Sequence, residues 1–230
     1  MNAKTIVSYD DTANDHDALA LGRVLASAGA DLQLAYVRHT TQAQRDREEL
    51  EEHEAQALLA RGARWLGDET VERRVVVSAS TCEGLGRLAE EIEASIIVFG
   101  SDYRTAARHV TPGRSAQGLI EGGPAAIAIA PANYRAEREH PIERIGVLVI
   151  GNDNAAQVTA RTLGEALGAE VVNRTTGIDL LVVGSRAEAP HGRVMITAQA
   201  EYAIETATSP VLIVPRGVPV RFPLPVAAAA

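Results

Sequence analysis

The chain has 230 residues, of which 46% are hydrophobic and 23% are charged, a balance typical of a globular protein with one or two cores. Its net charge is −8 and only 3% of its residues are aromatic, so the basic surface and stacking side chains of a nucleic-acid-binding protein are not expected. The sequence shows no long apolar segment and no signal peptide, which predicts a cytoplasmic protein without a membrane span.

The single cysteine, Cys82, excludes an internal disulfide and a cysteine-based zinc site. We interpret it as a small apolar residue near the start of a helix.

Short β-branched segments alternate with helical patterns through the first part of the chain. They predict strands at residues 5–9, 32–37, 71–77, 95–99 and 125–129, and helices at 15–28, 41–66, 82–92 and 116–121. Ser80 and Glu83 form a capping box that would begin the third helix. Strands separated by helices need right-handed crossovers, so we expect a flavodoxin-like α/β fold, a doubly wound parallel sheet of order 3-2-1-4-5.

The second part of the chain repeats the first. Residues 94–131 align without a gap with residues 178–215, 84 positions later, and nine of the 38 aligned residues are identical. In both copies a glycine and a serine, Gly100-Ser101 and Gly184-Ser185, follow a β-branched run directly. This places them at a strand exit, where α/β sheets hold ligands. Upstream, TIVSYDD at residues 5–11 resembles VLVIGND at residues 147–153.

The second copy lacks 58 residues between these two landmarks, about the length of two helices and a strand. Residues 168–177 are too few for a full strand and crossover, so we expect a reduced three-strand copy, with an edge fragment at residues 170–172. The predicted organisation is a first domain at 1–133, a linker at 134–144, a truncated second domain at 145–217 and a C-terminal tail at 218–230. The apolar last strands of the two copies, at 125–129 and 211–214, are expected to pair and form an internal pseudo-dimer.

These features give the chain a resemblance to the universal stress protein family in its tandem form, over residues 5–37, 92–131 and 147–215. In ATP-binding members of this family, an aspartate after the first strand and a G-x-x-G-x9-G-[ST] segment hold the nucleotide. Glycines let the backbone approach phosphate, and exposed amides at a helix start bind anions. The resemblance implies a stress-response regulatory or binding module, with ATP or AMP and magnesium as its ligand and no other cofactor.

The first copy matches this nucleotide motif incompletely. Asp10 matches the aspartate, Val37 the backbone contact after the second strand, and Gly100, followed by Ser101, the first glycine. Gly113 matches the third glycine. Tyr103 replaces the second glycine and is expected to occupy part of the ribose position, because a bulky residue adopts a positive φ only at a cost.

The hydroxyl residue that the motif places after Gly113 is also shifted. Arg114 stands there, with Ser115 one position late, and Arg114 is expected to pair with phosphate through its guanidinium. In the second copy the matching residues are Asn152, Gly184, Ala187, Thr197 and Ala198, which predicts no nucleotide site.

Three functions stay open from the sequence: a regulatory or binding module with a degenerate pocket, an ATP- or AMP-binding protein with slow or no hydrolysis, and a metal-dependent hydrolase. The last would use the acidic cluster Asp10, Asp11, Asp15 and Asp17, although acids at a helix start are expected from capping alone. Catalysis is not expected under the first function. The expected partners are a nucleotide or a protein. His16 and His39 lie near strand exits, where we expect them to be solvated.

Overall fold

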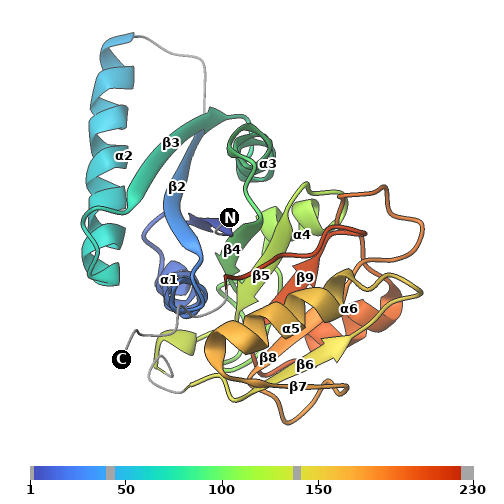
Figure 1. Ribbon diagram of the computed structural model, residues 1–230. Helices are drawn as coiled ribbons and strands as arrows, with labels where there is room; N and C mark the ends of the chain where they lie inside the picture. The colour runs from blue at the N-terminus through green and yellow to red at the C-terminus, as the bar shows by residue number, and fades with distance from the viewer. Residues whose placement is uncertain (1–2, 40–44, 137–140, 224–230) are drawn as a thin grey trace.

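The computed structural model describes residues 3–39, 45–136 and 141–223. The first half contains β1 (Lys4–Ser8), α1 (Ala13–Ser27), β2 (Asp31–His39), α2 (Arg45–Leu66), β3 (Glu72–Ser78), α3 (Thr81–Ile92), β4 (Ile96–Gly100), α4 (Arg114–Ile120) and β5 (Ala126–Ala130). The second half contains the 3-10 turn η1 (Tyr134–Ala136), β6 (Arg144–Leu148), α5 (Ala155–Leu167), β7 (Glu170–Val172), β8 (Leu180–Gly184), α6 (Ala198–Glu205) and β9 (Val211–Val214) (Figure 1).

The strands of both halves form one nine-stranded sheet of order β3-β2-β1-β4-β5-β9-β8-β6-β7. The first five strands are parallel in the order 3-2-1-4-5, so the predicted doubly wound sheet is confirmed. β5 pairs antiparallel with β9, with Ile127 opposite Ile213, which confirms that the last strands of the two copies pair (Figure 1). Every other pair in the sheet is parallel.

The second half repeats the first in reduced form, because β9-β8-β6-β7 follows the same order as β5-β4-β1-β2. The expected edge fragment is present as β7, which is three residues long and pairs with β6. Residues 173–179 connect β7 to β8 and run directly over β6. A Cβ atom at Gly146 would overlap the carbonyl oxygen of Arg174 and approach the side chain of Ile178 to 2.5 Å. The direct connection therefore requires a glycine in β6.

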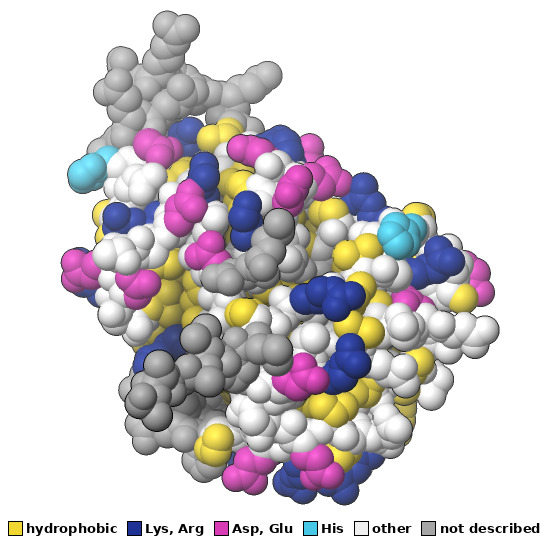
Figure 2. Space-filling view, viewed as in Figure 1, with side chains coloured by type: hydrophobic (Ala, Val, Ile, Leu, Met, Phe, Trp, Pro, Cys, Tyr) yellow, Lys and Arg dark blue, Asp and Glu magenta, His cyan; other side chains and the backbone are white. Residues whose placement is uncertain are grey.

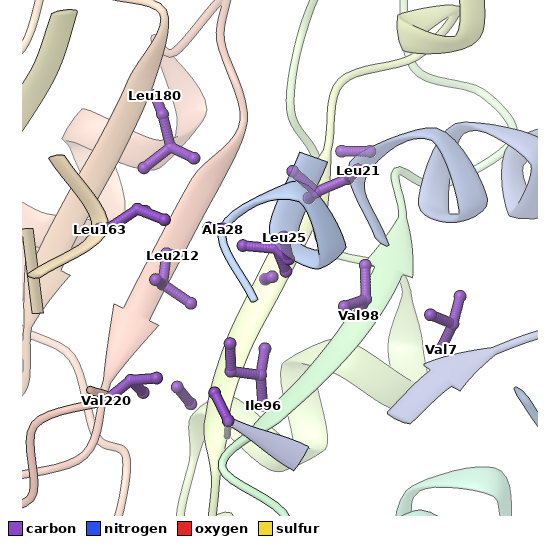
Figure 3. Packing of buried hydrophobic residues seen from close by; sticks show 14 of the residues in the cluster. Val7, Leu21, Leu25, Ala28, Ile96, Val98, Leu163, Leu180, Leu212 and Val220 are labelled. Atoms are coloured by element: carbon purple, nitrogen blue, oxygen red, sulfur yellow. The ribbon is translucent and has the colours of Figure 1, made fainter. Parts of the chain in front are cut away.

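The helices form a layer on each face of the sheet. Buried side chains of α1, α2 and α5 pack in one layer, and those of α3, α4 and α6 pack in the other. Figure 3 shows Leu25 of α1 in the same layer as Leu163 of α5 and Leu212 of β9. The two halves thus share continuous cores on both sides of the sheet.

The segment after β9 also belongs to this packing. Val220 and Phe222 are buried in the layer that holds α1 and α5. Their backbone amides donate hydrogen bonds to the hydroxyls of Thr159 (2.9 Å) and Thr162 (3.4 Å) of α5. This segment therefore contributes to the core as far as it is described.

The surface is consistent with the composition. On the face seen in Figure 2, acidic and basic side chains are interspersed. In the described part of the chain, no helix is long and apolar enough to cross a membrane. Cys82 lies in the first turn of α3, half-buried beside Gly118, and burial raises the pKa of its thiol, in agreement with its interpretation as a small apolar residue.

Candidate functional site

The strand order brings the predicted site residues to one edge of the sheet. β1 leads through α1 to β2 on one side, whereas its neighbour β4 leads through α4 to β5 on the other. Ligands of doubly wound sheets bind at the carboxyl ends of strands where the connections diverge in this way. Asp10 follows β1 and Gly100 ends β4, so these two residues lie at the switch point, and Val37 lies near the end of β2, one strand away.

The turn between β1 and α1 is organised by Asp15. Its carboxyl Oδ2 accepts hydrogen bonds from the backbone amide of Asp10 (3.0 Å) and from the amide and hydroxyl of Thr12 (2.9 and 2.8 Å). Asp15 therefore satisfies donors at the start of α1. Burial, with the neighbouring Asp10 carboxyl as a second cause, raises the pKa of Asp15 to about 8. The Asp10 side chain is exposed.

Asp11 is held by three side chains. It accepts hydrogen bonds from the Tyr9 hydroxyl (2.7 Å) and the Arg61 Nε (2.7 Å), and the His16 Nε2 lies 3.9 Å away. The Tyr9 hydrogen bond, followed by that of Arg61, lowers the pKa of Asp11. Burial raises the pKa of Tyr9, so its phenol stays protonated and donates.

Asp17 joins α1 to the turn after β5. Its fully buried carboxylate accepts hydrogen bonds from the amides of Asn133 and Arg135, both at 2.8 Å, and from the Arg135 guanidinium at 3.0 Å. These bonds satisfy the charge inside the protein.

The acidic cluster therefore divides among separate partners. Each of the three aspartates that were candidate metal ligands beside Asp10 is bonded to its own set of protein donors. Within the described ranges, no group of three or more His, Cys, Asp or Glu side chains could hold a metal ion. Helix capping explains Asp15, whereas Asp11 and Asp17 pair with arginines of α2 and of the turn after β5.

Two residues of α2 were missed by the sequence analysis. Arg61 bonds Asp11, and the Trp65 ring stacks on His16 with centroids 5.4 Å apart and planes 15° apart. The prediction that His16 is solvated is wrong, because it is half-buried in this stack. Arg61 and Trp65 are four residues apart, so they share a helix face, but nothing local indicates what that face covers. His39 is exposed, 3.3 Å from the Thr81 hydroxyl.

Gly100 and Ser101 are engaged by the protein itself. The buried Ser101 hydroxyl donates to the carbonyl of Ala130 at the end of β5 (2.7 Å) and accepts from the amide of Thr111 (3.3 Å). The Asn14 side chain donates to the Ser101 carbonyl (2.7 Å). The Asn14 backbone lies so close to Gly100 that a Cβ there would overlap it. The missing Cβ at Gly100 therefore leaves room for the backbone of α1.

The second half contains the same loop. The Ser185 hydroxyl donates to the Val214 carbonyl (2.7 Å) and accepts from the Met195 amide (3.3 Å). All three residues lie 84 positions after their counterparts in the first half. The repeated Gly-Ser pair thus closes a loop in both halves, including the half whose residues do not match the nucleotide motif.

Tyr103 differs from the expectation. Its side chain is 73% exposed, and the Arg104 guanidinium carbon lies 4.8 Å from the ring centroid. The ring extends into solvent beside the Arg104 guanidinium, and its occupation of part of the ribose position stays a prediction. Its φ is not positive, so this loop accommodates a tyrosine without strain.

The two helix starts after these loops are not equivalent. Gly113 precedes α4 with φ −69°, makes no side-chain cap and has open space where a Cβ would lie. Its counterpart Thr197 caps α6, accepting a hydrogen bond from the Ala200 amide (3.2 Å). Arg114 is exposed beside Gly113, and Ser115 is half-buried. The first half therefore leaves its helix start open, whereas the second half closes it.

Comparisons with known proteins extend this picture at the level of the fold. No protein-family model matches the sequence, and no curated protein sequence matches it significantly. A universal stress protein from Archaeoglobus fulgidus DSM 4304 has a similar structure, with a TM-score of 0.66 at 13% identity over 93% of this chain and 96% of that chain. A functionally unknown protein from Pseudomonas aeruginosa PAO1 gives a TM-score of 0.63 at 13% identity over 94% and 93% of the two chains.

Both alignments run through the two halves, so the likeness concerns the whole architecture. At this identity it shows a shared fold.

Proposed function

We propose that this chain is a binding or regulatory module of the universal stress protein type, in tandem form with a truncated second domain and one degenerate ligand pocket in the first half. The main supporting observation is the contrast between the two helix starts. The loop-closing serines are kept in both halves, but only Gly113 leaves its helix start open, whereas Thr197 closes the other.

The polar groups around the pocket support a role without catalysis. Asp11, Asp15 and Asp17 are each bonded to two or more protein donors, so they hold α1, α2 and the turn after β5 in place. A general base must instead reach the proton that it abstracts. The expected partners remain a nucleotide or a protein, and the cytoplasmic location remains a prediction.

The ligand class that the motif implies is ATP or AMP with magnesium. The phosphate would bind near Gly113, Arg114 and Ser115, and the adenine would lie toward Asp10 and Val37. We expect weak binding, because Gly100 and Ser101 are already used by the chain and Tyr103 interrupts the motif.

The experiment is calorimetry with ATP-magnesium and AMP, preceded by native mass spectrometry of freshly purified protein. The variant Tyr103→Gly/Arg114→Ser restores the family's pattern and should tighten binding about tenfold or more, an effect of ~1.4 kcal/mol. Ala187→Gly/Ala198→Ser makes the matched change in the second half and should have no effect. Submicromolar binding by the wild-type chain would contradict a degenerate pocket, and failure of the restored variant to bind either nucleotide would contradict a nucleotide pocket.

A second candidate is a competent ATP or AMP binder with slow or no hydrolysis. The observation that favours it is Arg114, which is exposed beside the open helix start where its planar guanidinium could bind phosphate in place of the missing hydroxyl. The single change Arg114→Ser separates the two candidates. It should weaken nucleotide binding if Arg114 has replaced the hydroxyl, and leave it unchanged or tighter if the pocket is degenerate.

A further inference from the structure

A groove of about 300 Å³ lies between α4 and α6. Its lining comes from both halves of the chain. The residues that line it are Thr111, Pro112, Gln117, Ile120, Glu121, Ile196, Glu201, Ile204 and Glu205.

The lining of this groove, here called the α4–α6 groove, is two-fold symmetric. Eight of its nine residues form four pairs separated by 84 positions, and two of the pairs are identical in sequence: Pro112/Ile196, Gln117/Glu201, Ile120/Ile204 and Glu121/Glu205. Because β5 and β9 pair antiparallel, a pseudo-twofold axis relates the halves. The members of each pair therefore lie on opposite sides of an axis that passes through the groove.

The groove combines an apolar floor with an acidic rim. Ile120 and Ile204 are buried at its base. Glu121, Glu201 and Glu205 are exposed at its edge, and no basic side chain lines it. Such a surface complements a ligand with an apolar body and positive charge.

The position of two of these glutamates strengthens the negative potential. Glu121 directly follows α4, and Glu205 is the last residue of α6. The carbonyl ends of both helices carry partial negative charge, which normally favours lysine or arginine. Neither helix has a basic residue in its last turn. Each end of the groove thus presents a carboxylate and helix carbonyls without a basic residue in the same turn.

We propose that the α4–α6 groove binds a linear aliphatic diamine. The hydrocarbon chain packs on Ile120 and Ile204, and one ammonium group lies at each of Glu121 and Glu205. The two-fold symmetry favours two like charges over one, and the volume is at the lower limit of small-ligand pockets. Its lining shares no residue with the proposed nucleotide pocket, although Thr111 and Pro112 directly precede Gly113, and the proposal does not rest on nucleotide binding.

The test uses the full-length chain and four probes of similar length in calorimetry: hexamethylenediamine, hexylamine, hexanediol and a diamine with an ether spacer. Hexamethylenediamine should bind. Hexylamine should bind about 2- to 5-fold more weakly through loss of one exposed ion pair, and hexanediol more weakly still. The ether-spaced diamine should also bind more weakly, because its spacer gains less from burial on the isoleucines.

Variants then locate the site. Glu121→Gln and Glu205→Gln should each weaken the binding of hexamethylenediamine about 2- to 5-fold. The double variant should weaken it about 4- to 25-fold. Both side chains are exposed, so thermal unfolding without ligand should show that the variants fold. Glu165→Gln, an exposed glutamate of α5 on the opposite face of the sheet, is the matched control and should bind as the wild type does.

Several outcomes would overturn the proposal: no diamine binding, equal weakening by Glu165→Gln, or displacement of the diamine by magnesium at equal concentration. Preference for a lysine-rich peptide over all four probes would also overturn it, in favour of a protein partner. Nucleotide binding should be unaffected by Glu121→Gln/Glu205→Gln, so failure here leaves the proposed function untouched.

Discussion

Ser101 and Ser185 each close the loop that follows a buried strand. Each hydroxyl donates to a carbonyl at the end of the neighbouring strand and accepts from an amide ten residues on. In a buried position such a group has no water to replace a lost partner, so its removal leaves two backbone groups without a hydrogen bond.

We therefore expect Ser101→Ala to lower the free energy of unfolding by about 1–3 kcal/mol. The exposed Ser27 at the end of α1, also hydrogen-bonded to a carbonyl, is a matched control whose change to alanine should cost less than ~0.5 kcal/mol. Denaturant unfolding checks both values. Equal small effects of the two substitutions would show that the Ser101 hydrogen bonds contribute little.

The raised pKa of Asp15 predicts that the stability of the fold depends on pH. Its pKa in the folded chain is raised to about 8, against 3.8 when unperturbed. The folded state therefore holds a proton that the unfolded state releases. The protonated Asp15 contributes fully to the free energy of unfolding below pH 4, and this contribution is lost as the pH rises toward 8.

Asp15→Asn keeps an oxygen that can accept from the Asp10 and Thr12 amides but cannot ionise. Its free energy of unfolding should exceed that of the wild type by about 1 kcal/mol at pH 8, after allowance for partial exposure, and equal it near pH 4. Asp17→Asn is the contrasting control, because it removes the partner of Arg135 and should destabilise the protein by about 2–4 kcal/mol at both pH values. Denaturant unfolding at pH 4 and pH 8 tests both expectations. An Asp15→Asn variant that is less stable than the wild type at pH 8 would contradict the raised pKa.

At the scale of elements, the second half has the strand order of the first with two helices and one strand fewer. In place of a helical crossover, residues 173–179 connect β7 directly to β8. That replacement depends on Gly146, where the connection lies against the backbone of β6.

Gly146→Ala should therefore lower the free energy of unfolding by about 1–3 kcal/mol, because the colliding atom is a backbone carbonyl that cannot rotate away. Gly86→Ala, inside α3, would place its Cβ 3.4 Å from the end of the flexible Leu119 side chain. This control should stabilise the protein by about 0.5–1 kcal/mol through helix propensity. Thermal unfolding should show that the two substitutions change stability in opposite directions. A Gly146→Ala variant as stable as the wild type would show that the connection between β7 and β8 can move.

For the whole molecule, the two halves share one nine-stranded sheet and the cores on both of its faces. Leu163 and Leu212 of the second half pack in the same layer as Leu25 of the first, and the segment of residues 218–223 extends that layer (Figure 3). A fragment of the second half alone would expose this layer and the edge of β9.

Residues 143–230 expressed alone should therefore lack a cooperative thermal transition by circular dichroism. Residues 1–136 hold five strands and four helices and should fold. The β5 edge of this fragment is uncovered and carries no charge, so it should pair with the same edge of a second copy. Sedimentation equilibrium should then show a dimer. A monomeric second-half fragment with a cooperative transition would show that this half is self-sufficient.

The sequence by itself determined the elements and the order of the first five strands, because hydrophobic periodicity, caps and crossover handedness are local or follow from chain connectivity. It also determined the pairing of β5 with β9, since two apolar strands without protecting charges in matching repeats have few other ways to be covered. Only the tertiary structure decided the roles of the polar residues. Asp11 meets Arg61 across 50 positions and Asp17 meets Arg135 across 118, and no local pattern specifies such partners. The repeated Gly-Ser pair indicated a ligand site, but its hydroxyls bond carbonyls 29 residues away, because a buried donor must find its acceptor wherever the fold places one.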